Sequence, residues 1–197
     1  MTAANRPDTD TTPRRFASQG AWEAWLRRYH HSADGVWLLI AKQGAADATV
    51  SYAEALESAL CFGWIDGQKK GVDAQYWQQR FTPRRARSTW SKINRAKVLA
   101  LIEQGRMQPA GLREVERAQA DGRWDDAYDS AKTATVPADL QAALDDDPKA
   151  RAFFETLDGA NRYAVLWRVQ TAKKAETRAR RIAQFVAMLG RHEKLHA

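Results

Sequence analysis

Apolar residues recur every three or four positions through most of the chain, the spacing that buries one face of a helix. The first such stretch follows Ser18, a residue type that caps helix N-termini, and places Trp22 and Trp25 on one face. A capping box, Ser51-x-x-Glu54, starts the second. The pattern predicts helices over residues 19–30, 51–62, 91–105, 109–120, 137–144, 148–157, 159–171 and 173–189.

Two regions depart from this helical spacing and are typical of strands. Residues 36–40 form a short apolar run between turn signals, which predicts a buried strand. Residues 64–71 and 75–82 flank a turn at Gly71–Asp73 and predict a hairpin that ends at Pro83. A hairpin favours antiparallel pairing, and a regular alternation of strand and helix is missing.

The predicted fold class is therefore α+β, with a small antiparallel sheet, helices packed on it, and a C-terminal helical unit. The polar stretch 1–15 is expected to be a disordered tail, because it is rich in Thr, Asp and Pro. Residues 16–124 are predicted to form the α+β domain and 137–197 the helical unit. Between them, residues 125–136 have few large apolar side chains and are interpreted as a linker.

Charge is distributed unevenly along the 197 residues, whose net charge is +7. Residues 66–97 hold nine basic and two acidic side chains, so this segment alone carries +7. Residues 121–147 hold eight acidic and two basic side chains, a balance of −6. A basic segment of this density favours anionic partners.

Several classes of protein lack support in the sequence. The longest apolar run, residues 36–41, is far shorter than the roughly 20 residues that span a bilayer. The N-terminal residues lack the apolar core of a secretory signal, and the single Cys61 cannot form an internal disulfide. We therefore expect a cytoplasmic protein without a membrane span.

No catalytic or metal centre is recognisable, and no cofactor is predicted. His192-Glu-Lys-Leu-His196 matches the zinc motif H-E-x-x-H, but it follows the expected helix end at Gly190 and is interpreted as a frayed tail. Cys61 has no histidine nearby in the sequence and is expected to be a buried hydrophobe. The protein is interpreted as a non-enzyme, with an enzyme that uses Asp66 as an acid or base kept as an alternative.

Residues 61–94 are dense in aromatic and arginine side chains and carry the predicted binding surface. Tryptophans would stack on a ligand, arginines would neutralise its charge, and polar side chains would orient it. A basic run on the last predicted helix adds one more arginine. The candidate ligand-binding residues are Trp64, Asp66, Trp77, Arg80, Arg84, Arg85, Ser88, Trp90, Ser91, Asn94 and Arg178.

The same residues allow less specific interpretations. Trp64 suits a core position after a helix that ends at Gly63, and the arginines suit a solvated loop whose aromatic residues face inward. The run around Arg178 is adequately explained as a solvated helix surface. For the ligand, an anionic or aromatic small molecule or a peptide is the leading hypothesis. Sequence-independent binding of a nucleic acid strand is the alternative.

Several uncommon strings occur in one order along the chain. They are Tyr52-x-Glu-Ala-Leu, Cys-Phe-Gly-Trp-Ile-Asp-Gly at 61–67, Arg-Phe-Thr-Pro-Arg-Arg at 80–85, Ser88-x-Trp-Ser-x-x-Asn94, and Ala172-Lys-Lys-x-Glu-Thr-Arg178 with Arg181-Ile182. Through these strings the chain resembles the bacteriocin-protection YdeI/OmpD-associated family. The resemblance implies stress resistance, protection against bacteriocins or antimicrobial peptides, and a porin-associated partner in bacteria. No catalytic residue follows from it.

Overall fold

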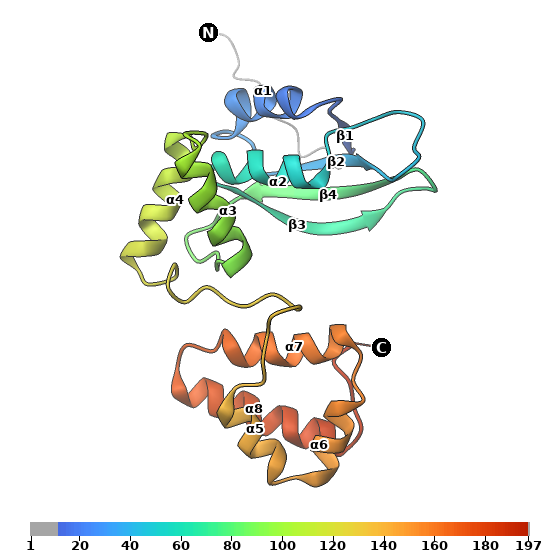
Figure 1. Cartoon of the computed structure of the whole chain (residues 1–197), viewed down its shortest axis with the longest axis vertical. Coiled ribbons are helices and arrows are strands. Elements are labelled where there is room, and N and C mark those ends of the chain that lie inside the picture. The colour runs from blue at the N-terminus through green and yellow to red at the C-terminus, as the bar shows by residue number, and fades with distance from the viewer. Residues whose placement is uncertain (1–11, 197) are drawn as a thin grey trace. The chain divides into compact units, whose positions relative to one another are not determined.

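The computed structural model describes residues 12–196, which form two compact units (Figure 1). The first unit contains the described chain up to Trp90 together with Asn94–Asp126. The second contains the short segment Ser91–Ile93 and the chain from Ala127 onward. Within the described range there are four strands and eight helices, which confirms the predicted α+β class. None of these helices combines the length and apolar character needed to cross a bilayer.

The first unit is built on a mixed sheet with the strand order β1-β2-β4-β3. The hairpin and the buried strand lie where the sequence predicts them and pair antiparallel. Arg14 and Arg15 add a short parallel strand at the edge of β2, so the tail predicted over 1–15 is wrong for these two residues, and residues 1–11 lie outside the described range. The strands are β1 Arg14–Arg15, β2 Val36–Ala41, β3 Trp64–Gly71 and β4 Tyr76–Pro83.

Helices α1 (Gln19–Tyr29) and α2 (Tyr52–Cys61) cover one face of this sheet (Figure 1). Trp22 of α1 is fully buried, donates its indole N–H to the Ala55 carbonyl of α2 at 3.1 Å, and packs against Phe81 of β4. The capping box at Ser51 is present, with both of its hydrogen bonds formed. An aromatic core therefore holds the two helices on the sheet.

Two further helices, α3 (Lys92–Glu103) and α4 (Pro109–Ala120), follow the sheet. At Gly111, α4 approaches the end of α2 so closely that an added Cβ would lie 2.3 Å from the Cys61 carbonyl oxygen. Gly63, which links α2 to β3, has φ of +76°, a conformation that glycine adopts readily. Glycine at both positions allows α2, α4 and β3 to meet at one point.

The second unit consists of helices around a mainly aliphatic core, and each helix begins and ends within two residues of its prediction. The side chains of Asp147 and Asp158 cap α6 and α7 by accepting backbone N–H bonds. Leu140, Phe154 and Phe185 are among the buried core residues. The helices are α5 Ala138–Asp145, α6 Pro148–Glu155, α7 Gly159–Gln170 and α8 Ala175–Gly190.

Residues 125–136, the predicted linker, contain neither a helix nor a strand longer than a bridge. Most of this segment is nevertheless fixed to the second unit. Asp129 accepts hydrogen bonds from Lys92 at 2.8 Å and from the Gln170 amide at 2.7 Å, and its carbonyl accepts one from Tyr163 at 2.9 Å. The second unit therefore includes residues before Pro137, where the sequence had placed its start.

Candidate functional sites

Two of the three candidate tryptophans lie in the core of the first unit. Trp64 is 1% exposed, donates its indole N–H to the His30 carbonyl at 3.1 Å, and packs edge-to-face against Trp25. Trp90 is 2% exposed and packs against Trp124. Neither ring offers a face to solvent. Both tryptophans therefore occupy core positions, the less specific interpretation that the sequence allowed.

Arg84, one of the candidate arginines, is buried, with 6% of its surface exposed. Its guanidinium carbon lies 3.5 Å from the centre of the Trp90 ring, and its Nη1 donates to the Thr89 carbonyl at 3.1 Å. Its backbone N–H donates to the Gly63 carbonyl at 2.9 Å. A cation that stacks on tryptophan away from water is a stabilising arrangement, so Arg84 has a structural role as well as a charge.

Asp66, Trp77 and Arg80 lie on the sheet, each beside another side chain. Asp66 accepts a hydrogen bond from the Tyr52 hydroxyl at 2.8 Å, and burial together with this carboxylate raises the pKa of Tyr52. Lys69 lies over the Trp77 ring at 4.3 Å. Arg80 lies 6.0 Å from the centre of Trp37, at the outer limit of a cation–π contact.

The remaining candidates are divided between the units. Ser88 shapes the loop after β4: its hydroxyl accepts from the Arg85 N–H at 2.9 Å, and its carbonyl accepts from Arg123 at 2.6 Å. Asn94 belongs to the first unit, on α3, whereas Ser91 and Arg178 belong to the second. Ser91 forms an isolated bridge with Tyr128 there.

Trp64 and Arg84 meet at a recess of about 220 Å³ in the first unit, which we call the basic cleft. The end of α1, the α2–β3 junction, the end of β4 and the exposed flank of α4 enclose it. Three arginines and two histidines line it against one glutamate, Glu114, which pairs with Arg117 at 3.2 Å. The lining residues are His30, His31, Phe62, Gly63, Trp64, Pro83, Arg84, Ala110, Arg113, Glu114 and Arg117.

A second recess of about 310 Å³ adjoins the basic cleft and shares His30, Phe62, Ala110 and Arg113 with it. Arg27 adds another cation to its wall. The Nδ1–H of His30 donates to the Leu26 carbonyl at 2.8 Å, which fixes the ring and leaves Nε2 as its other polar atom. Sequence reasoning missed these histidines and arginines, although the spacing of Arg113 and Arg117 on a predicted helix places both on one face.

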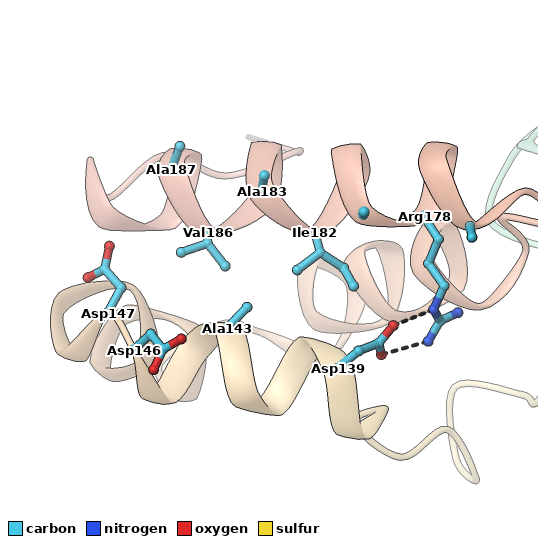
Figure 2. Close-up of a pocket in the computed structure, with 11 residues that line it drawn as sticks. Asp139, Ala143, Asp146, Asp147, Arg178, Ile182, Ala183, Val186 and Ala187 are labelled. Carbon is cyan, nitrogen blue, oxygen red and sulfur yellow. Dashed lines mark hydrogen bonds and ion pairs between the residues drawn. The ribbon is translucent and has the colours of Figure 1, made fainter.

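A larger recess, about 680 Å³, lies in the second unit between α5 and α8, and we call it the α5–α8 groove (Figure 2). Figure 2 shows Ile182 and Val186 of α8 pointing toward Ala143 of α5. Alanines recur at every fourth position along this flank of α8. The lining residues are Asp139, Ala143, Asp146, Asp147, Ala175, Arg178, Ala179, Ile182, Ala183, Val186 and Ala187.

Arg178 closes one end of this groove through a bidentate ion pair with Asp139, with an Nη2–Oδ1 distance of 2.8 Å (Figure 2). Its Nη1 also donates to the Val169 carbonyl at 2.8 Å, and Arg181 donates to the Arg168 carbonyl. The hydrogen bond from Arg178 holds the pKa of Asp139 below its usual range. These arginines thus bind carbonyls at the C-terminal end of α7 and join α5, α7 and α8.

The described part of the chain contains no cluster of side chains able to hold a metal ion. The expectation of a frayed C-terminal tail is wrong: the His192 ring stacks on Phe153 at 4.8 Å, and the His196 N–H donates to the Asn161 side chain at 2.9 Å. Cys61 is buried, and burial raises the pKa of its thiol to about 11. The thiol is therefore protonated at neutral pH and is a poor nucleophile.

Two known families match the chain, and they match different parts of it. Residues 14–114, or 101 of 197, match a family described as a domain of unknown function (DUF8412). Residues 133–192 match the family described as bacteriocin-protection, YdeI or OmpD-associated, and include the string Ala172–Arg178. No curated protein and no solved structure matches the chain. The chain thus belongs to the DUF8412 family through residues 14–114, and its residues 133–192 carry the bacteriocin-protection, YdeI or OmpD-associated segment.

Proposed function

We propose that this protein is a non-enzymatic resistance protein of the bacteriocin-protection type, which acts in the cytoplasm by binding an anionic or aromatic small molecule in the basic cleft. The family match over residues 133–192 supports the resistance role. The description of that family also supports a porin-associated partner. The binding role rests on the first unit alone.

The observation that carries the proposal is the charge of the basic cleft. Arg84, Arg113 and Arg117 line one recess of about 220 Å³ with a single carboxylate, Glu114. Guanidinium groups suit carboxylate and phosphate because they present paired N–H donors in one plane. Pro83 and Ala110, which are partly exposed, supply apolar surface in the same recess. An anion that carries an aromatic or other apolar group matches both kinds of wall.

Binding of a nucleic acid strand has less support than binding of a small anion. Strand binding relies on aromatic rings that are open to bases, whereas Trp64 and Trp90 are buried.

Acid–base catalysis by Asp66 also has less support. The Asp66 carboxylate is hydrogen-bonded to Tyr52, whose raised pKa makes the phenol a poor proton donor. This pairing favours a binding role over acid–base catalysis.

Calorimetric titration of the full-length protein with pyrophosphate and with benzoate tests the proposal. We expect one site that takes at least one of these anions, and a loss of about tenfold in affinity when Arg113 and Arg117 are both changed to alanine, roughly 1.4 kcal/mol. Matched controls are Arg87→Ala and Arg85→Ala, combined in one variant, which remove the same charge from an exposed loop outside the cleft.

The control should bind within twofold of the wild type. Equal losses in both variants would mean that net charge alone attracts the anion, and the cleft would then have no specific role. Absence of binding for both anions would also overturn the proposal. A short nucleic acid strand that binds with a steep salt dependence would support the alternative instead.

A further inference from the structure

We infer that the α5–α8 groove is a docking site for a basic amphipathic helix of a partner polypeptide. The groove and the basic cleft share no residue, so this inference is independent of the proposed anion binding. It rests on three features of the second unit: an exposed stripe of alanines, an apolar floor, and an acidic wall.

The alanine stripe gives the groove a shape that suits a helix. Ala175, Ala179, Ala183 and Ala187 are exposed and lie four residues apart on α8. The first and last of them are 12 residue steps apart on α8, or about 18 Å at 1.5 Å per residue. Small side chains along such a ridge let the backbone of a second helix approach closely, and this length accommodates anchors at positions i, i+3 or i+4, and i+7.

The floor of the groove is apolar and offers room for larger anchors. Ile182 and Val186 project from α8 toward Ala143 on α5 (Figure 2). The recess of about 680 Å³ is within the range of sites that enclose a ligand. Large aliphatic side chains of a docked helix would fill it and remove apolar surface from water.

The acidic wall selects a basic occupant. Asp139 is neutralised by Arg178, and Asp147 accepts the backbone N–H groups of Lys149 and Ala150. Asp146 is different, because no side chain in the described range forms a hydrogen bond or ion pair with its carboxylate. It is also adjacent to Asp147, so two carboxylates stand together at this end of the groove and repel each other. A lysine or arginine on the docked helix would offset that repulsion.

A second copy of this chain fits the groove less well than a separate helix. The large apolar residues of α8, such as Phe185 and Leu189, are buried in its own core. An α8 from another copy could therefore offer mainly its alanine stripe, which would leave most of the groove unfilled. A partner whose leucine or isoleucine side chains are free to insert is the better match.

Fluorescence anisotropy on the full-length protein tests the inference with two labelled synthetic helices. Both carry leucine at positions i, i+3, i+4 and i+7, and the remaining positions are lysine in one peptide and glutamate in the other. We expect the lysine peptide to bind at least tenfold more tightly than the glutamate peptide. Asp146→Asn should reduce this preference severalfold.

Ala183→Phe should weaken binding of the lysine peptide at least tenfold, because the ring occupies the groove. Gln184→Phe is the matched control: it adds the same ring to the next, exposed position of α8, outside the lining, and should bind within twofold of the wild type. The variant lacking Arg113 and Arg117 should also bind the peptide normally, so failure here is distinct from failure of the proposed anion site.

Three results would overturn the inference. The peptides could bind equally well, Ala183→Phe could leave the affinity unchanged, or light scattering could reveal a dimer that Ala183→Phe dissociates. The last result would assign the groove to a second copy of the chain.

Discussion

The two units of this protein use their cations in different ways. In the first unit, Arg84, Lys69 and Lys70 each lie over a tryptophan ring. In the second, Arg178 and Arg181 bind carbonyl oxygens at the end of α7, and Arg178 also binds a carboxylate. In both units, many of the basic side chains that the sequence concentrates in these segments are therefore already in contact with groups of the protein itself. A dense cluster of charged and aromatic residues is therefore as much a packing device as a ligand surface.

The units also differ in how closely their elements pack. In the first, Gly63 at the α2–β3 junction and Gly111 in α4 allow close backbone contacts beside an aromatic core. In the second, a mainly aliphatic core holds four helices and leaves the α5–α8 groove open on one side. The consequence is that substitutions should be tolerated differently in the two units.

Gly111→Ala should have the largest effect on stability. The new Cβ would lie 2.3 Å from the Cys61 carbonyl oxygen, and backbone atoms cannot yield as a flexible side chain can. We expect a loss of about 3 kcal/mol or more in the free energy of unfolding, measured with denaturant. The matched control is Gly20→Ala in α1, where the nearest atom is 3.9 Å away and a gain of up to about 1 kcal/mol is expected. A stable Gly111→Ala variant would contradict the close packing of the first unit.

Arg178→Met should have a smaller but clear effect on the second unit. It removes the ion pair with Asp139 and the hydrogen bond to the Val169 carbonyl while keeping an apolar stem. The pair is partly exposed and screened by solvent, so we expect a loss of about 1–2 kcal/mol. Arg180→Met, at an exposed neighbouring position, should change stability by less than about 0.5 kcal/mol. Equal effects of the two changes would refute the bracing role of Arg178.

The smallest expected effect is a difference between Arg178→Met and Arg180→Met in how their stability depends on pH. Hydrogen bonding to Arg178 lowers the pKa of Asp139 in the folded protein, so this carboxylate stabilises the fold above its unfolded pKa of about 3.9. That contribution is lost as pH falls below this value through the folded pKa. In urea titrations from pH 5 downward, Arg178→Met should therefore lose less stability than Arg180→Met. Parallel curves would mean that the ion pair adds little.

Hydrophobic periodicity predicted the helices and the hairpin well because these elements bury one continuous face. The helix predicted over 109–120 has these bounds in the structure, and β3 and β4 differ from their predictions by one residue at most. The strand at Arg14–Arg15 could not be predicted, since two exposed polar residues carry no alternation and pair only through their backbone.

The sites were harder to predict than the elements. Trp64 and Arg84 do share a recess, but its other basic residues come from α4 and from the segment after α1, and no local pattern links those segments to the hairpin. The α5–α8 groove gave no sequence signal, because alanines occur on buried and exposed helix faces alike. Residue type located the basic segment. Tertiary packing decided which of its side chains reach a cavity.

The aromatic core described above also determines what light spectroscopy can observe. Trp167 is the one tryptophan beyond residue 126, and the remaining seven of the eight indoles belong to the first unit. Trp22 and Trp25 are stacked with ring centres 5.2 Å apart and planes 15° from parallel, close enough for their excited states to couple. Emission and near-ultraviolet dichroism will therefore report mainly the melting of one half of the chain. Replacing Trp167 with phenylalanine would leave the other half without an indole, with Tyr128 and Tyr163 as its strongest remaining chromophores.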